Sequence, residues 1–350
     1  MAVMALDFRS ANRFAIAYEA GWMMHIASGR AVLAERELNG NQSIEARERA
    51  LQIRLQAGGK VEDISEMTPR YREVLEQTML IAADLEMSTL GFNYPAILNA
   101  PTLDAKISIM SAVQDELGHA QVTYRLLEDF GYDTEELLFR RDPKFFRTFY
   151  LVQHPVNDYV TAVISMLIGD RAGYTTTLDI EESCSYGPYS RSLRKVNFEE
   201  KFHVAYGEKW TEYFWNKGPK TRKRIQDAVD FYFPLGATWF GLPDHMKTRP
   251  DQLQYKVRAQ SNDALRQRWL AQVVPFCERV GIKIPAHFDR EKGQYVLDYE
   301  MPILLNEETG KWDFRTVTWE EQFAQWKKGG PIKTETFRRL QDEVWGDDLW

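Results

Sequence analysis

The sequence predicts an all-α protein whose core is a four-helix bundle that holds two metal ions. Two long segments with helical periodicity each carry a Glu-x-x-His motif, one at Glu116 and His119 and the other at Glu200 and His203. This spacing places a carboxylate and an imidazole on one helical face, one turn apart. One acidic residue stands thirty positions before each motif. Two helix pairs that each supply one carboxylate and one such motif form the ligand set of di-iron or di-manganese bundles.

The two preceding acids are Glu86 and Asp170. We prefer Glu86 to the nearby Asp84 because its spacing matches that of the second half. Asp170 follows a nearly continuous apolar run over residues 160–168, so we expect it inside the core. A buried carboxylate without a partner is strongly unfavourable, and several of them in one bundle therefore indicate a compensating cation.

Periodicity and end signals predict six helices. Pro69 suits the first turn of the first helix, Thr102 is a good N-cap for the second, and Gly131 ends the second. We expect a break over residues 92–98 and a stop of the fifth helix at Pro234. The six helices are expected over residues 71–90, 102–130, 157–178, 187–218, 220–232 and 261–280.

The chain is expected to comprise three regions. Residues 1–66 form a helical N-terminal arm, with helices over 11–38 and 43–56. Residues 67–280 form the di-metal helical domain, and residues 281–350 form a C-terminal extension.

The extension has a different pattern of polar and apolar residues from the bundle. Residues 294–299 and 312–317 alternate between polar and apolar, and residues 308–310 carry a turn signal, which predicts a β-hairpin or an extended tail. A last short helix is expected over residues 336–344.

Composition excludes several classes of protein. With 350 residues, 44% hydrophobic and 27% charged, the chain is a folded globular protein. Its net charge of −7 argues against a nucleic-acid partner or an anionic membrane surface. Cys184 and Cys277 stand alone, so we expect free thiols in a reducing cytoplasm. We find no membrane-length apolar run and no signal peptide.

Further acids stand beside the two motifs. Asp115 and Glu199 precede the motif glutamates and could orient a histidine nitrogen. The alternative is a solvated charge, which fits Glu199 equally well. The remaining four histidines have no acid at ligand spacing, and we interpret them as structural. Neither phosphate-binding nor nucleophile-elbow motifs occur, and no CxxC pair is present, so electrons would have to arrive through another protein.

Longer blocks of sequence carry a family resemblance. Residues 114–119 (QDELGH), 184–189 (CSYGPY), 199–203 (EEKFH) and 261–268 (SNDALRQR) together resemble the catalytic component of the phenylacetyl-CoA epoxygenase family. These enzymes are ring 1,2-epoxidases of aerobic phenylacetate breakdown. The resemblance covers residues 68–323 and implies a ferritin-like fold.

The resemblance also implies a role for each ligand position. It assigns terminal ligands to each of two irons and two bridging carboxylates between them. The implied pairs are Glu86 with His119 on one iron and Asp170 with His203 on the other, with Glu116 and Glu200 as the bridges.

The family binds the CoA part of its thioester substrate. Positions that match there are Arg147, Lys256 and Asn262, with Lys247 as a fourth candidate. Each of them could instead be an ordinary solvated residue. On the first bundle helix the family tends to place an Arg and a Gln on the CoA side, whereas this chain has Gln77 and Ile81.

The activity implied is a di-iron, O2-dependent monooxygenase that epoxidises the aromatic ring of an aryl-CoA thioester such as phenylacetyl-CoA. One oxygen atom enters the ring and the other leaves as water. Two electrons come from NAD(P)H through a separate flavin or iron–sulfur reductase, and a metal-free homologous helical subunit is the expected structural partner. The ligands suit manganese as well as iron.

Four other interpretations use a similar ligand set or fold. A ribonucleotide reductase small subunit would need a Tyr one turn after the first motif, where this chain has Thr123. An acyl-carrier desaturase has a similar length and similar ligands. A metal-free scaffold subunit of an oxygenase complex is disfavoured because all six ligand positions are filled, and iron-storage ferritins are much shorter chains.

Overall fold

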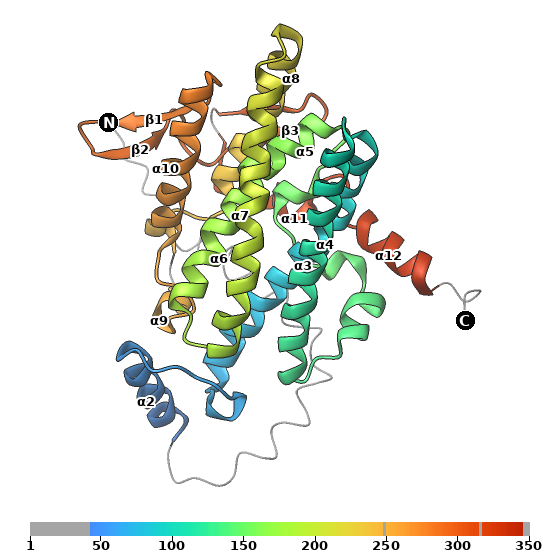
Figure 1. Cartoon of the computed structure of the whole chain (residues 1–350). Helices are drawn as coiled ribbons and strands as arrows, with labels where there is room; N and C mark the ends of the chain where they lie inside the picture. Colours follow the sequence, from blue (N-terminus) through green and yellow to red (C-terminus); the bar gives the residue numbers. More distant parts are fainter. Residues whose placement is uncertain (1–42, 248–249, 315–316, 346–350) are drawn as a thin grey trace.

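The computed structural model describes residues 43–247, 250–314 and 317–345. Four long helical elements lie side by side at its centre (Figure 1). The third of them is composite, because a π-helical segment joins two α-helices. The four elements are α3 (Pro69–Asn99), α4 (Leu103–Asp129), the series α5 (Tyr159–Ser165), η6 (Met166–Asp170) and α6 (Arg171–Ser183), and α7 (Gly187–Trp215).

The neighbours in this bundle are well defined. Helix α3 packs on α4 and α5, α6 packs on α7, and α4 packs on α7. Thr102 caps α4 by accepting a hydrogen bond from the amide of Ala105, as its sequence predicts. The predicted all-α, ferritin-like four-helix bundle is therefore confirmed.

Further helices surround the bundle. Helix α8 packs against α5, α7 and η6, and α10 packs against α6. The remaining helical elements are α2 (Ile44–Gln56), η2 (Ile64–Glu66), η3 (Glu136–Arg140), η4 (Pro143–Phe145), η5 (Tyr150–Gln153), α8 (Pro219–Thr238), η7 (Asp244–Met246), α9 (Asp251–Gln254), α10 (Asn262–Val280), α11 (Trp319–Lys328) and α12 (Glu335–Trp345). No helix in these ranges is long and apolar enough to span a bilayer.

Two predicted helix boundaries are wrong. The break expected over residues 92–98 does not occur, because α3 continues to Asn99. Lys106 donates hydrogen bonds to the carbonyls of Ile97 and Leu98, and so satisfies acceptors that the end of a helix leaves without partners. Helix α8 likewise continues through Pro234 to Thr238. Residues 232–238 are all buried, and this packing outweighs the backbone hydrogen bond that the proline removes.

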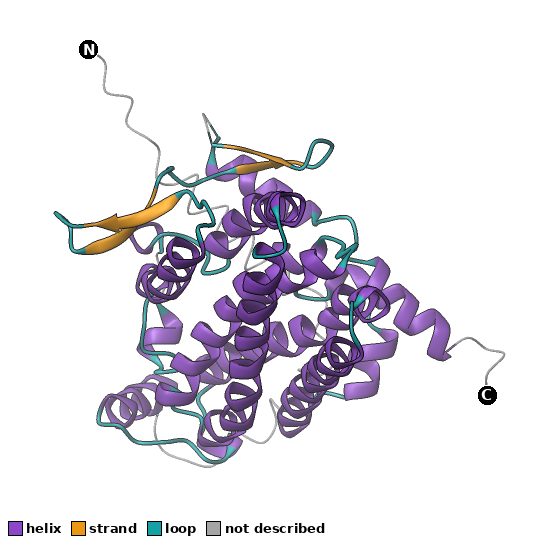
Figure 2. Cartoon of the chain, turned by 45° about the horizontal axis from the view of Figure 1, so that its top comes forward, coloured by secondary structure: helices purple, strands orange, loops and turns teal. Residues whose placement is uncertain are grey.

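The extension contains two hairpins rather than one, both at one end of the bundle (Figure 2). Strand β1 (Ala286–Asp289) pairs antiparallel with β2 (Gln294–Leu297), and β3 (Leu304–Asn306) pairs with β4 (Lys311–Asp313). The predicted turn at residues 308–310 lies between β3 and β4, whereas residues 294–297 pair with residues 286–289. A strand takes the nearest upstream partner here because Gly293, at φ +64°, closes a tight turn.

The described part of the N-terminal arm is anchored to the body of the protein. Helix α2 matches the helix predicted over residues 43–56, has Ser43 as its N-cap, and buries Leu51 and Leu55. Glu48 of α2 accepts a hydrogen bond from the hydroxyl of Tyr255. The helix predicted over residues 11–38 lies outside the described residues.

Two hydrophobic clusters fill the bundle, one toward each end. Along α4, Ile109 and Ala112 belong to one cluster, whereas Tyr124 and Leu127 belong to the other. The two Glu-x-x-His motifs lie between these clusters, so a polar layer divides the core. Cys184 and Cys277 are buried, unbonded thiols, as expected.

Candidate metal centre

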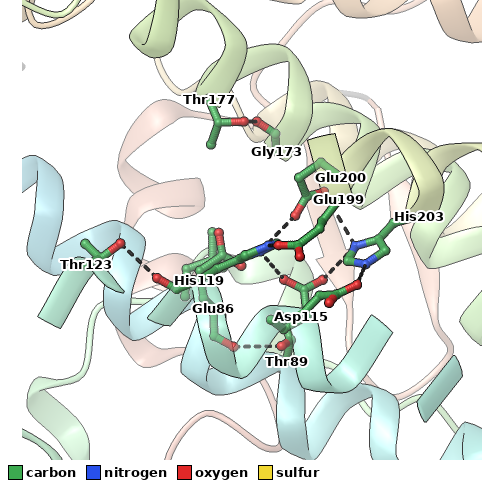
Figure 3. A network of polar contacts seen from close by, with 12 residues as sticks. Glu86, Thr89, Asp115, His119, Thr123, Gly173, Thr177, Glu199, Glu200 and His203 are labelled. Carbon is green, nitrogen blue, oxygen red and sulfur yellow. Dashed lines mark hydrogen bonds and ion pairs between the residues drawn. The ribbon is translucent and has the colours of Figure 1, made fainter. Parts of the chain in front are cut away.

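All six ligand-type side chains that the sequence singles out come together inside the bundle. Figure 3 shows four of them, Glu86, His119, Glu200 and His203. Each of the four bundle elements contributes at least one of the six. Their potential ligand atoms form two groups, and within each group these atoms lie within 4.8 Å of one another. One group is Glu86, Glu116, His119 and Glu200, and the other is Glu116, Asp170 and His203.

The two motif glutamates lie between the two imidazoles. Glu116 places Oε2 3.3 Å from Nδ1 of His119 and Oε1 3.3 Å from Nδ1 of His203. Glu200 places Oε1 3.3 Å from Nδ1 of His119 and Oε2 3.8 Å from Nδ1 of His203. Each carboxylate thus divides its two oxygens between the two halves of the centre, an arrangement that suits a bridging ligand.

Four of the six side chains are almost fully shielded from solvent, whereas Glu86 and Asp170 are half-buried. The exposed fraction is 2% for His119, 3% for His203 and Glu116, and 5% for Glu200. Several polar atoms of the cluster lack a hydrogen-bond partner among the described residues, which is rare for buried groups. These atoms are Oε2 of Glu116, Nδ1 of His119, Oδ2 of Asp170 and Nδ1 of His203. Oxygen and imidazole donors without partners, aimed into one dry space, fit a pair of divalent metal ions.

Burial and mutual repulsion shift the acid pKa values upward. Burial and the charge of Glu116 raise the pKa values of Glu86 and Asp170 well above the ordinary range, and the same causes raise the pKa of Glu200. For Glu116 itself burial opposes ionisation, but the contacts with His119 and His203 hold its pKa below the ordinary value.

The pKa values of the two imidazoles are also raised, which favours their charged forms. Burial disfavours the charged ring, yet contacts with Glu116 and Glu200 raise the pKa of His119 to about 12. A contact with Glu116 and the charge of Glu200 raise the pKa of His203 to about 11 in the same way. The metal-free centre therefore stores protons, and ligation has to release them because only the neutral ring binds a metal.

A second pair of acids holds the outer nitrogens of the two rings. Nε2 of His119 lies 3.1 Å from Oε2 of Glu199, and Nε2 of His203 lies 3.3 Å from Oδ2 of Asp115. Each acid belongs to the helix opposite its histidine. Such a contact fixes the orientation of the ring and leaves Nδ1 facing the centre. Of the two roles that the sequence leaves open, the structure favours orientation over solvation.

Asp170 owes its position to the π-helical segment η6. A π turn inserts one extra residue per turn and is frequent at functional sites. Opposite it, α7 comes unusually close through Gly207, where a Cβ atom would lie 2.8 Å from the backbone nitrogen of Leu167. The composite helix and this close approach bring Asp170 to the same level as His203.

One large cavity of about 1920 Å³ reaches the centre at Glu86. Its wall is rich in aromatic side chains, and Phe149 stacks on Trp239 with ring centroids 4.2 Å apart. Gln77 and Ile81, which depart from the family pattern, both line it. The cavity can therefore receive a large ligand with an aromatic part.

The four residues proposed for CoA lie in different environments. Arg147, Lys247 and Asn262 line the cavity, whereas Lys256 is not among its lining residues. The amide of Asn262 is already engaged, since Nδ2 donates to the carbonyl of Leu242 over 2.8 Å. Lys256 adopts a left-handed backbone conformation at φ 53°, and its carbonyl accepts a hydrogen bond from the amide of Ser185.

Sequence reasoning missed Arg258. Only 6% of Arg258 is exposed, it lines the cavity, and its Nε has no hydrogen-bond partner among the described residues. Its Nη2 donates to Oδ1 of Asn262, one helical turn away in sequence. Two basic residues, Lys256 and Arg258, precede the Ser261 N-cap and are the sequence signal for a basic residue here. The prediction chose Lys256 of the two.

The fold and this cluster define a class: ferritin-like helical proteins with a candidate di-metal centre. The family described as phenylacetic acid catabolic protein matches residues 41–321, and the chain belongs to that family. Over 203 residues the chain is 28% identical to the A component of the 1,2-phenylacetyl-CoA epoxidase of Escherichia coli (strain K12). The match covers 57% of this chain and 65% of that protein, so the chain spans just under two thirds of its relative.

Proposed function

We propose that this chain is the oxygenase subunit of a di-iron, O2-dependent monooxygenase that epoxidises the aromatic ring of an aryl-CoA thioester such as phenylacetyl-CoA. The observation that carries the proposal is the buried cluster of six ligand-type side chains at the end of a large aromatic cavity. Membership of the phenylacetate family and similarity to a component of an epoxidase support an oxidoreductase.

The proposed ligand set follows the two groups of side chains. Glu86 and His119 would hold one iron, Asp170 and His203 the other, and Glu116 and Glu200 would bridge them. Bound iron would supply the O2 chemistry, and manganese suits the same donors.

The chain's own residues would position the reactants. Asp115 and Glu199 would keep the imidazoles in register, and the hydrophobic clusters on either side would exclude water. The aromatic cavity wall would hold the ring near the centre, while Arg258, Arg147 and Lys247 would face anionic groups of the thioester.

The proposed activity requires partners. We propose a separate flavin or iron–sulfur reductase that delivers electrons from NAD(P)H, and a metal-free homologous helical subunit. The E. coli relative is named as one component of its epoxidase, which supports an assembly of several chains. A cytoplasmic location accords with the free thiols.

Metal analysis combined with a single-turnover assay tests this proposal. The chain is reconstituted anaerobically with ferrous iron, reduced chemically, and mixed with O2 and a panel of aryl-CoA thioesters. We expect about two irons per chain and a product that gains one oxygen atom. Glu116→Ala and His203→Ala should each abolish metal uptake or turnover, whereas His245→Ala, an exposed control, should retain both. If both ligand variants keep wild-type metal content and rate, the assignment is wrong.

A further inference from the structure

The C-terminal extension forms part of the cavity wall. Phe323, Trp326 and Lys327 of α11 line the cavity, together with Lys333 just beyond that helix. All four lie after residue 321, where the match to the family ends. The match to the family model therefore does not reach these four residues.

Side-chain hydrogen bonds fix α11 in this position. Gln322 is almost fully buried and donates to the carbonyl of Ile303. Gln325 exchanges two hydrogen bonds with the backbone of Leu305, at 3.1 and 2.6 Å. Helix α11 is thus held on the β3 strand rather than resting loosely on the cavity.

A second attachment lies directly after α11. The amide of Gly330 donates to Oε1 of Gln153, and the amide of Ile332 donates to the Gln153 carbonyl. Nε2 of Gln153 in turn donates to both the carbonyl and the hydroxyl of Thr148, which lines the cavity, at 2.9 Å each. A Cβ atom on Gly330 would lie 2.6 Å from the carbonyl oxygen of Gln153, so this approach requires glycine.

Helix α12 reinforces the same wall from behind. Phe337 is fully buried and stacks on Phe146, which lines the cavity, with ring centroids 3.6 Å apart. Two separate contacts therefore join the extension to the cavity wall.

Lys333 stands out among the cavity-lining residues of the extension. It is half-buried, and burial lowers the pKa of its amine. No acidic side chain of residues 43–247, 250–314 or 317–342 forms an ion pair with it. Lys328, by contrast, is exposed, does not line the cavity and pairs with Glu307 at 2.7 Å. A desolvated ammonium without a counter-ion, facing a cavity, is suited to an anionic ligand group.

We propose that residues 319–333 are part of the substrate site and that Lys333 is a specificity-determining residue that pairs with a phosphate of the substrate. The inference rests on the proposed function, since a CoA thioester carries its phosphates at the end remote from the acyl group. It assigns to the extension a binding role that residues 41–321 alone would not supply.

Calorimetric titration of the metal-free chain tests this inference. The ligands are phenylacetyl-CoA, its 3′-dephospho analogue, and the phosphate-free thioester of phenylacetate with pantetheine. Lys333→Gln should weaken phenylacetyl-CoA binding about tenfold, the size of one charge-assisted hydrogen bond, and leave the pantetheine thioester unaffected. Lys333→Arg should retain binding, and Lys328→Gln should match the wild type. Loss of the Lys333→Gln effect with the dephospho analogue would locate the contact at the 3′-phosphate, and its persistence would locate it at the diphosphate.

Gly330→Ala provides an independent arm, because it should displace the wall and weaken all three ligands. Binding of phenylacetyl-CoA by Lys333→Gln as tight as by Lys328→Gln would overturn the inference and leave the proposed function intact. An equal loss for the pantetheine thioester would also overturn it. If the wild type binds none of the thioesters, the proposed function itself fails.

Discussion

Histidines in this chain occupy buried sites of opposite electrostatic character. Whereas acids surround His119 and His203, His154 lies between the rings of Tyr150 and Phe231 and is only 5% exposed. Burial lowers the pKa of His154 to about 4. Its ring is therefore neutral in the folded chain at pH values where the unfolded chain already binds a proton.

His154 should accordingly make stability depend on pH. Between the unfolded value of 6.5 and the folded value of about 4, only the unfolded state gains the proton, so the free energy of unfolding falls as the pH falls. The loss should approach about 3 kcal/mol at pH 4. Urea titrations of His154→Phe should show a shallower dependence of the unfolding free energy on pH in this window than those of the wild type. Parallel slopes for the two proteins would contradict the prediction.

Asp84 lies close to Glu86 in sequence but does not have the thirty-residue spacing to a Glu-x-x-His motif. Hydrogen bonds, rather than a metal ion, compensate its buried charge. Asp84 is fully buried and accepts hydrogen bonds from the hydroxyl of Tyr124 at 2.6 Å, from Arg141 and from the amide of Arg147 at 2.7 Å. It thus joins α3 to the loop that forms one wall of the cavity. Tyr124 is engaged in this contact and belongs to the structural network.

Asp84→Ala should destabilise the fold strongly. It leaves the guanidinium of Arg141 partly buried without its partner, a loss of about 3–5 kcal/mol in unfolding free energy. Asp227→Ala, which removes an exposed acid paired with Lys223, should change the denaturation midpoint little. Equal midpoints for the two variants would show that Asp84 does not hold the wall.

The sequence could predict the six ligand-type residues because their spacing is itself the signal. Basic cavity residues carry no such signal: Arg258 and Lys333 resemble solvated residues until the fold shows Arg258 buried and Lys333 half-buried beside the cavity. Lys256 does not line the cavity, and its carbonyl accepts a hydrogen bond from the amide of Ser185, so its assignment to CoA stays a prediction.

Among the elements, the close approach of α7 to η6 depends on one glycine. In Gly207→Ala the added methyl group would meet the backbone of Leu167, which cannot give way as a side chain could. We expect a loss of about 1–3 kcal/mol in stability. Because His203 lies one turn before Gly207, metal content should fall as well.

Gly118→Ala is the matched control on α4. A Cβ atom there meets nothing within 4 Å, so alanine should stabilise the helix by about 0.5–1 kcal/mol. Thermal melts and metal analysis of the two variants decide the matter. Similar melting temperatures would mean that helix spacing at the centre is not set by Gly207.

Element type was easier to predict than element ends. The helix over 102–130 followed from its cap and its periodicity. Periodicity could not reveal η6, because the apolar run passes through it without a change of residue type. At α3 the hydrogen bonds from Lys106 allow the helix to continue through the predicted break. At α8 the burial of residues 232–238 outweighs the effect of Pro234. In the extension, alternation indicates strands but does not identify their partners, so it could not predict that β2 pairs with β1.

At the scale of the molecule, metal binding and folding should be coupled. The centre joins four elements through six side chains, so an ion that binds only the folded chain stabilises it. At a free metal concentration one hundred times Kd, the gain is about 2.7 kcal/mol. Thermal melts under argon with and without ferrous iron should show this shift for the wild type and lose it in Glu116→Ala. An identical shift in both would place the bound iron elsewhere.

The division of the chain at residues 67 and 281 stays a prediction. The extension shares the cavity with the bundle through Trp326 and Lys333, so we propose that it folds onto residues 67–280 rather than apart from them. Limited proteolysis that releases an intact bundle able to bind phenylacetyl-CoA at full affinity would contradict this view.

The polar layer between the two hydrophobic clusters has a consequence for engineering. Replacing all six ligand-type residues by Leu or Met would join the two hydrophobic clusters into one continuous hydrophobic core. Since uncompensated buried charge opposes folding, this inert variant should resist guanidinium better than the metal-free wild type, by about 1–4 kcal/mol. A guanidinium midpoint below that of the metal-free wild type would mean that the six polar side chains do not destabilise the fold. On this view, the polar layer is retained for the chemistry of the centre although it lowers the stability of the metal-free fold.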